Sequence, residues 1–240
     1  HYLVTLRDGG QFHTHAGITD HDAIIGRYEG ITARSGTGAR YVVVRPTLAD
    51  FVLAMPRGAQ VIYPKDLGPL LVLGDIFSGA RVLEAGVGSG ALSMALLRAG
   101  AEVVGYEIRD DFAIKAKANV ETFLGAGAAY RVDARDVYDG IDETDLDRVM
   151  LDLPEPWRVV GHAAGALHPG GILVSYLPTI GQVAQLRQAL DASAFGLART
   201  IEVLERSWHV EGQSVRPDHR MVAHTGFLTS ARLLGTEHPA

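Results

Sequence analysis

Residues 81–91 constrain the fold of this chain more than any other stretch. They read Arg-Val-Leu-Glu-Ala-Gly-Val-Gly-Ser-Gly-Ala, which is a short apolar run, an acid and a turn with three glycines. Glycine lacks a Cβ, so it permits a tight turn and a close approach of the backbone to a ligand. The next residues, Leu-Ser-Met-Ala-Leu-Leu, indicate a helix. Strand, glycine loop and helix in this order predict a nucleotide-binding pocket.

From residue 67 onward, strand-like runs alternate with helical periodicity, which is typical of an α/β domain with a mostly parallel sheet. The pattern predicts strands near residues 81–85, 102–107, 128–133, 147–152 and 171–176. It predicts helices over residues 89–99, 110–124, 155–166 and 182–190. Two later runs, 198–206 and 225–233, are expected to form a closing antiparallel pair.

The first sixty residues have a different pattern. Short apolar runs at residues 2–6 and 41–44 are separated by glycine-containing turns. These are strand and turn signals, so a small β domain is expected, as a compact barrel or sandwich. We place the domain boundary so that residues 1–63 form this β domain and residues 64–240 form the α/β domain.

Composition narrows the class of protein. The 240 residues are 47% hydrophobic and include no cysteine, which excludes disulfides and thiolate chemistry. No apolar run approaches the roughly 20 residues that a membrane-spanning helix needs, so we expect no membrane partner and a cytoplasmic location. The net charge is −6, yet residues 1–65 hold seven Lys and Arg against five acids. This mildly basic part is either ordinary solvated surface or an RNA-facing patch.

Acidic side chains follow the predicted strands. The glycine loop alone, as Gly86-x-Gly88-x-x-Ala91, also satisfies the loose dinucleotide fingerprint. Glu107 ends the second strand, where a carboxylate can accept hydrogen bonds from both ribose hydroxyls of an adenosine-containing ligand. Asp136 follows the third strand, where an adenine amino group would need an acceptor. Asp133 competes for that role, and a solvated acidic loop is the alternative for both.

The second strong motif is Asp152-Leu-Pro-Glu-Pro-Trp157, which directly follows a buried strand. The two prolines stiffen the loop and hold the aspartate at the carboxyl end of the strand. Open α/β sheets bind ligands at that end, so the glycine loop, Glu107, Asp136 and Asp152 are expected at one rim. A catalytic role for Asp152 is favoured; its alternative is the N-cap of a helix that starts near Glu155.

These motifs resemble those of the class I S-adenosylmethionine-dependent methyltransferases, and within them the tRNA (adenine-N1)-methyltransferases of the TrmI type. The segment 84–90 looks like the cofactor loop of that family and 152–157 like its catalytic motif. Val61-Ile-Tyr-Pro-Lys-Asp resembles the loop before the core, and Gly10-Gln-Phe-His-Thr-His-Ala-Gly fits its N-terminal β domain. The resemblance covers nearly the whole chain and is greatest to actinobacterial members.

The resemblance implies a Rossmann-like sheet, mostly parallel with an antiparallel last strand, and S-adenosylmethionine as the cofactor. It implies a homotetramer that methylates N1 of the T-loop adenosine at tRNA position 58. Asp152 would face the target adenine as well as the cofactor, and Tyr63 would line the base pocket. The implied cofactor-binding residues are Glu84, Gly86, Gly88, Ser89, Gly90, Ala91, Leu92, Glu107, Asp136, Val137 and Asp152.

Two other functions remain open from the sequence. A nicotinamide-dependent oxidoreductase shares the glycine loop, and a non-catalytic RNA-binding subunit would share the overall fold. The histidines invite a metal site, because His13 and His15 would point to the same face of a strand. No carboxylate completes such a site, so a polar β-surface and no metal are expected. The segment 216–225 resembles a family segment near the active site; its alternative is an ordinary loop.

Overall fold

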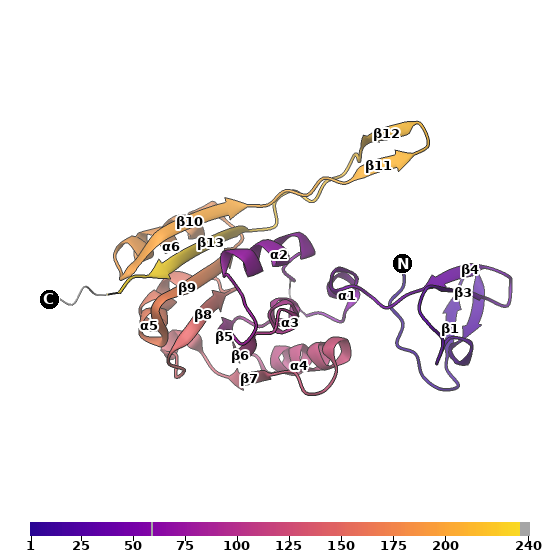
Figure 1. Cartoon of the computed structure of the whole chain (residues 1–240), viewed down its shortest axis with the longest axis horizontal. Coiled ribbons are helices and arrows are strands. Elements are labelled where there is room, and N and C mark those ends of the chain that lie inside the picture. The colour runs from indigo at the N-terminus through magenta and orange to yellow at the C-terminus, as the bar shows by residue number, and fades with distance from the viewer. Residues whose placement is uncertain (59, 236–240) are drawn as a thin grey trace. The chain divides into compact units, whose positions relative to one another are not determined.

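The computed structural model describes residues 1–58 and 60–235. The chain forms two compact units, His1–Met55 and the residues from Pro56 onward (Figure 1). The boundary suggested by the sequence, between residues 63 and 64, lies in the second unit, directly before its first helix.

The N-terminal unit is built from two antiparallel hairpins and one short helix. Its elements are β1 (Gln11–Thr14), β2 (Gly17–Asp20), η1 (His21–Ala23), β3 (Ile31–Arg34), β4 (Arg40–Val43) and α1 (Leu48–Ala54). β1 pairs with β2 and β3 pairs with β4. Helix α1 begins with a capping box, in which Thr47 and Asp50 each accept a hydrogen bond from the backbone of the other.

Two expectations for this unit were wrong. Within the described residues, segment 2–6 forms no strand, and most of its side chains are exposed. β1 ends at Thr14, so His15 lies in the turn and does not share a strand face with His13. An apolar run becomes a strand only where a partner edge is available for pairing, and no such partner is present here.

The second unit is organised around a seven-stranded sheet. Its strands are β5 (Arg81–Ala85), β6 (Glu102–Glu107), β7 (Tyr130–Ala134), β8 (Leu146–Leu151), β9 (Leu167–Leu177), β10 (Phe195–Glu202) and β13 (Phe227–Leu233). Their order is β10-β13-β9-β8-β5-β6-β7. The strands are parallel except β13, which is antiparallel to both of its neighbours. The predicted mostly parallel sheet with an antiparallel last strand is confirmed.

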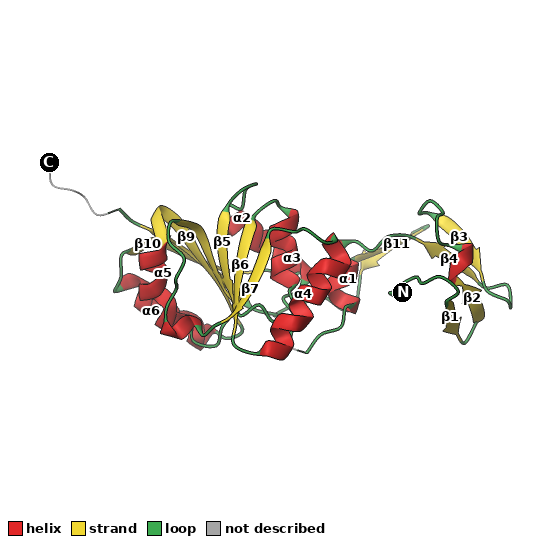
Figure 2. Ribbon diagram, turned by 90° about the horizontal axis from the view of Figure 1, so that it is seen from below, coloured by secondary structure: helices red, strands yellow, loops and turns green. Residues whose placement is uncertain are grey.

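Helices cover both faces of this sheet (Figure 2). One face carries α2 (Pro64–Leu73), α3 (Ala91–Arg98) and α4 (Asp110–Leu124), and the other carries α5 (Val160–Ala166) and α6 (Ile180–Asp191). Short 3-10 turns, η2 (Val137–Asp139) and η3 (Pro156–Val159), follow β7 and β8. The strands are buried on both faces. In β5 and β8, Leu83 and Val149 belong to one core cluster, and their neighbours Val82 and Met150, which point to the opposite face, are buried as well.

A hairpin leaves the sheet between β10 and β13. It consists of β11 (Trp208–Glu211) and β12 (Ser214–Pro217), which pair antiparallel. The sequence did not indicate it. Among the described residues, the structure contains no helix long and apolar enough to cross a membrane.

Candidate active site

The glycine loop begins where β5 ends, and its shape depends on the absence of side chains. Gly86 has a φ of +83°, and a Cβ at this position would lie 2.1 Å from the carbonyl oxygen of Asp152. Gly90 also has a φ of +83° and forms the N-cap of α3, where a Cβ would lie 3.3 Å from the backbone of Ala116. Both positions therefore require glycine, one for contact with the Asp152 loop and one for packing on α4.

Asp152 lies directly after β8, beside the glycine loop. Its backbone N–H donates to the carbonyl of Ala85 over 3.0 Å, which joins the ends of β8 and β5. The first turn of η3 begins at Pro156 and is preceded by Glu155, so Asp152 does not cap that helix. No described residue donates a hydrogen bond to its carboxylate. The helix-cap alternative is therefore wrong, and the side chain is free to bind a ligand.

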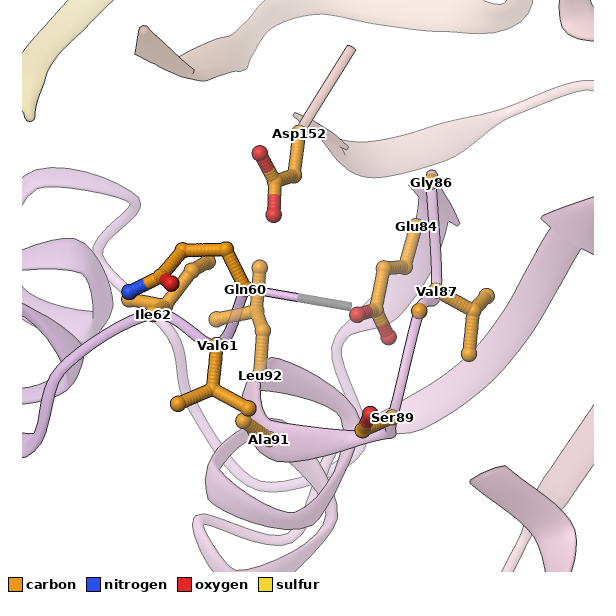
Figure 3. Close-up of a pocket in the computed structure, with 11 residues that line it drawn as sticks. Gln60, Val61, Ile62, Glu84, Gly86, Val87, Ser89, Ala91, Leu92 and Asp152 are labelled. Atoms are coloured by element: carbon orange, nitrogen blue, oxygen red, sulfur yellow. The ribbon is translucent and has the colours of Figure 1, made fainter. Parts of the chain in front are cut away.

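A pocket forms between three segments of the second unit. The glycine loop and the start of α3 provide one wall, Asp152 the second, and the residues before α2 the third. In Figure 3, the carboxylates of Glu84 and Asp152 and the hydroxyl of Ser89 turn toward the same central space. The lining residues are Gln60, Val61, Ile62, Glu84, Gly86, Val87, Gly88, Ser89, Ala91, Leu92 and Asp152.

Most of the cofactor-binding residues expected from the sequence thus lie together. Sequence reasoning missed Val87 and the wall formed by residues 60–62. The signal for that wall was present, because the two apolar residues Val61 and Ile62 precede a proline that starts a helix. Both side chains are buried although they lie outside any strand or helix.

The two acids in the pocket have perturbed ionisation. Burial raises the pKa of Glu84 to about 8. The hydrogen bond from Ser93 lowers this pKa, and the negative charge of Asp152 raises it further. Burial also raises the pKa of Asp152 to about 7, and the negative charge of Glu107 adds to this effect. Such shifts occur where carboxylates are withdrawn from water without a compensating cation. They are typical of functional sites.

Glu107 lies behind the glycine loop rather than among the pocket-lining residues. It is 7% exposed, and its two carboxylate oxygens accept hydrogen bonds from the backbone N–H groups of Gly88 and Arg109, at 3.1 and 3.0 Å. This arrangement fixes the position of the loop relative to the end of β6. Each oxygen retains an acceptor site for a further donor.

Five other residues singled out from the sequence lie outside the lining set. One of them is Gly90, the N-cap residue of α3. Asp136 accepts a hydrogen bond from the backbone N–H of Tyr138 at 2.9 Å, and Val137 is buried in the core. Asp133, the competitor of Asp136, forms an ion pair with Arg131. Tyr63 is half-buried and is the N-cap residue of α2, one residue beyond the pocket wall.

The histidine segments have structural contacts. His224 bonds through its two ring nitrogens to the carboxylate of Glu202 and the carbonyl of Pro178, both at 2.7 Å. These contacts attach the segment before β13 to the end of β9. Within residues 1–58 and 60–235, no group of three or more His, Asp or Glu side chains has the arrangement needed to hold a metal ion.

The sheet order, the glycine loop after its central strand and the acids at the adjacent strand ends define a class I S-adenosylmethionine-dependent methyltransferase. Comparison with known families narrows this class. A family described as tRNA methyltransferase complex GCD14 subunit matches residues 40–217, and one described as TrmI-like N-terminal matches residues 1–32. The chain therefore belongs to the TrmI-type family of tRNA (adenine-N1)-methyltransferases.

Individual relatives agree with this membership. The chain is 40% identical over 235 residues to the tRNA (adenine(58)-N(1))-methyltransferase TrmI of Thermus thermophilus, covering 96% of this chain and 92% of that protein. A solved S-adenosylmethionine-dependent O-methyltransferase from Thermotoga maritima superposes with a TM-score of 0.93 and 32% identity, over 99% of this chain and 90% of that one. The solved tRNA (m1A58) methyltransferase TrmI from Aquifex aeolicus superposes with a TM-score of 0.86 and 29% identity, over 98% of this chain and 93% of that one.

These findings confirm the family predicted from the motifs, and with it S-adenosylmethionine as the cofactor. The residues present fit that molecule. Ser89 is 4% exposed, and its hydroxyl has no hydrogen-bond partner among the described residues although it faces the pocket. A buried hydroxyl of this kind normally has a partner, so a polar ligand group is expected beside it. Membership of this family does not support the alternative of a nicotinamide-dependent oxidoreductase.

Proposed function

We propose that this chain transfers a methyl group from S-adenosylmethionine to N1 of the adenosine at position 58 in the T loop of tRNA. The observation that carries the proposal is the position of Asp152, whose carboxylate is unpaired and faces the pocket beside the glycine loop. The named activities of the relatives from Thermus thermophilus and Aquifex aeolicus support the substrate.

The proposed cofactor contacts follow the pocket walls. Glu84, Ser89 and the backbone from Gly86 to Leu92 would hold the polar end of S-adenosylmethionine. Glu107 would accept from the ribose hydroxyls through its remaining acceptor sites. Asp136 and Val137, which follow β7 at the same edge of the sheet, would contact the adenine ring of the cofactor.

Methyl transfer requires alignment more than acid–base catalysis, because S-adenosylmethionine supplies an already activated methyl group. The target adenine would have to leave its stack in the folded RNA to enter the site. Tyr63 would line the base pocket, and the carboxylate of Asp152 would accept a hydrogen bond from the exocyclic amine. That bond strengthens as N1 gains positive charge, so it stabilises the transition state more than the ground state.

The test is methylation of unmodified tRNA with labelled S-adenosylmethionine, followed by nucleoside analysis. We expect 1-methyladenosine in wild-type tRNA and none in a tRNA that carries guanosine at position 58. Asp152→Ala should abolish transfer while the protein keeps its thermal unfolding midpoint. Near-normal turnover by this variant would overturn the role of Asp152. Label at another nucleotide would overturn the substrate.

We further propose that the chain assembles as a homotetramer in the cytoplasm, where its tRNA substrate is found. The hairpin supports an interface, because Trp208, Val210 and Val215 are 61%, 71% and 60% exposed and share one face. Exposed apolar faces of this kind are typical of protein contacts. Light scattering should give the mass of four chains for the wild type and a smaller mass for Val210→Lys. A wild-type mass of one chain would contradict the assembly.

A further inference from the structure

The loop that carries Asp152 is stiffened by its prolines but has few backbone hydrogen-bond donors of its own. Residues 152–155 connect β8 to η3, and two of the next positions in the motif, Pro154 and Pro156, have no backbone N–H. No described residue donates to the carboxylate of Asp152. The position of this carboxylate therefore depends on what holds the loop backbone.

Three hydrogen bonds from elements other than η3 hold that backbone, in addition to the turn bond that the N–H of Arg158 donates to the carbonyl of Glu155. From β5, the carbonyl of Ala85 accepts from the N–H of Asp152. From η2, the hydroxyl of Tyr138 accepts from the N–H of Glu155 at 3.1 Å. From α6, the side-chain amide of Gln182 donates to the carbonyl of Pro154 at 2.9 Å. The last two partners are side chains that do not line the pocket.

Both side chains are themselves held in place. The hydroxyl of Thr179 donates to the amide oxygen of Gln182 at 2.6 Å, which orients the amide nitrogen toward Pro154. The guanidinium of Arg158 lies 4.2 Å from the ring centroid of Tyr138 and also pairs with Glu155 at 3.0 Å. The Tyr138 ring is thus fixed against the same loop that its hydroxyl contacts. These contacts form a rigid support for residues 154 and 155 rather than incidental surface bonds.

We propose that Tyr138 and Gln182 are positioning residues that fix the Asp152 carboxylate for methyl transfer. The inference rests on the proposed function of Asp152. Without these two bonds the loop would move, and a misplacement of about 1 Å at a reacting group costs on the order of 10²-fold in rate. Neither side chain lines the pocket, so the effect is expected on turnover and not on binding.

The variants are Tyr138→Phe and Gln182→Met, which remove the two contacts and keep the side-chain volume. The matched control is Tyr106→Phe. The hydroxyl of Tyr106 accepts from the N–H of Asp142 at 3.1 Å, the same type of bond, in a loop that carries no residue of the site. It also donates to the carboxylate of Glu143, so the control removes at least as many contacts as either variant. Thermal unfolding of all variants identifies any that is destabilised, and kinetics are measured well below the lowest unfolding midpoint.

We expect the two variants to lower kcat about ten-fold or more, with the KM for S-adenosylmethionine within about two-fold of wild type, and Tyr106→Phe to keep wild-type kcat. Equal kcat for the control and the two variants would overturn the proposal. So would a rise in KM at constant kcat, because that result would indicate a binding role.

A second measurement does not depend on tRNA. Protein labelled with carbon-13 at its aspartate carboxyls reports the titration of Asp152, assigned with Asp152→Asn. In wild type this carboxyl should titrate near its raised pKa of about 7. Its pKa should fall in the two variants, because a mobile loop exposes it to water, and should stay unchanged in Tyr106→Phe. Unchanged titration in the two variants would refute positioning. A wild type that methylates no tRNA would refute the proposed function instead.

Discussion

The ion pair between Lys65 and Asp66 should be one of the most sensitive contacts in the second unit. The Nζ of Lys65 lies 2.8 Å from the carboxylate of Asp66, and the two side chains are 3% and 0% exposed. Asp66 also accepts from the hydroxyl of Thr225 at 2.6 Å, and Lys65 donates to the carbonyl of Val203. The pair thus attaches the start of α2, beside the pocket wall, to the segments on either side of the hairpin.

Asp66→Asn removes one charge and nearly preserves shape, so the buried ammonium of Lys65 loses its counter-ion. Removing one partner of a buried pair costs about 3–5 kcal/mol. For a protein of this size each kcal/mol lowers the unfolding midpoint by about 2–4 °C, which gives a fall of roughly 6–20 °C. Lys65→Met combined with Asp66→Asn should recover part of this loss, because no uncompensated charge remains.

The measurement is thermal unfolding by circular dichroism, with Asp111→Asn as the control. Asp111 forms an ion pair with Arg109 of similar length, 2.9 Å, but the two side chains are 61% and 57% exposed. Exposed pairs contribute about 0–1 kcal/mol, so this control should hardly shift the midpoint. If the two variants lose similar stability, burial does not determine the strength of the Lys65–Asp66 pair and the reasoning fails.

Three further predictions concern the pocket. Gly86→Ala should abolish S-adenosylmethionine binding in calorimetry, because its Cβ would collide with the carbonyl of Asp152; retained affinity would contradict this geometry. Glu107→Ala should weaken that binding, because the loop N–H of Gly88 loses its acceptor, and unchanged affinity would remove Glu107 from the site. Glu84 has a pKa raised to about 8, so the folded protein keeps a proton that the unfolded chain loses above its ordinary value of 4.5. Stability should therefore fall as pH rises from about 4.5 to 8, and urea unfolding of Glu84→Gln should show a shallower fall; an identical slope would disprove the assignment.

The central sheet was predictable because its signals are local. β5, β6 and β8 are mainly apolar runs that end at or just before a glycine or an acid, and parallel strands place their carboxyl ends at one edge. That rule alone predicts that the glycine loop and Asp152 lie at the same edge of the sheet. The strand predicted near residues 171–176 is longer in the structure, where β9 begins at Leu167 and ends at Leu177. The residues added at its start contribute one paired position, Leu167 with Leu146, and the register with β8 shifts before it resumes at Ile172.

Other elements were not predictable from local pattern. Helix α2 contains Gly68 and Pro69, both helix-disfavouring residues, but it forms because Pro64 suits the first turn and Leu67 and Leu70 are buried. The hairpin β11–β12 was missed because its strands are largely exposed, so burial leaves no clear alternation of hydrophobic and polar residues. The sequence marks the third pocket wall only by the apolar pair Val61 and Ile62 before a helix. The position of this pair opposite the glycine loop follows from packing against distant segments.

Charge decides the cofactor, which the glycine loop alone left open. Glu84 and Asp152 face one pocket, and the pKa of each is raised by burial and by the charge of neighbouring carboxylates. No Lys or Arg of the described residues pairs with either of them. A dinucleotide would bring the anionic pyrophosphate against these acids, and above neutral pH, where both are ionised, the repulsion would oppose its binding. S-adenosylmethionine carries a sulfonium and an ammonium, so its binding relieves the repulsion between the carboxylates. The same acids that destabilise the empty pocket above neutral pH therefore favour a cationic methyl donor over a nicotinamide cofactor.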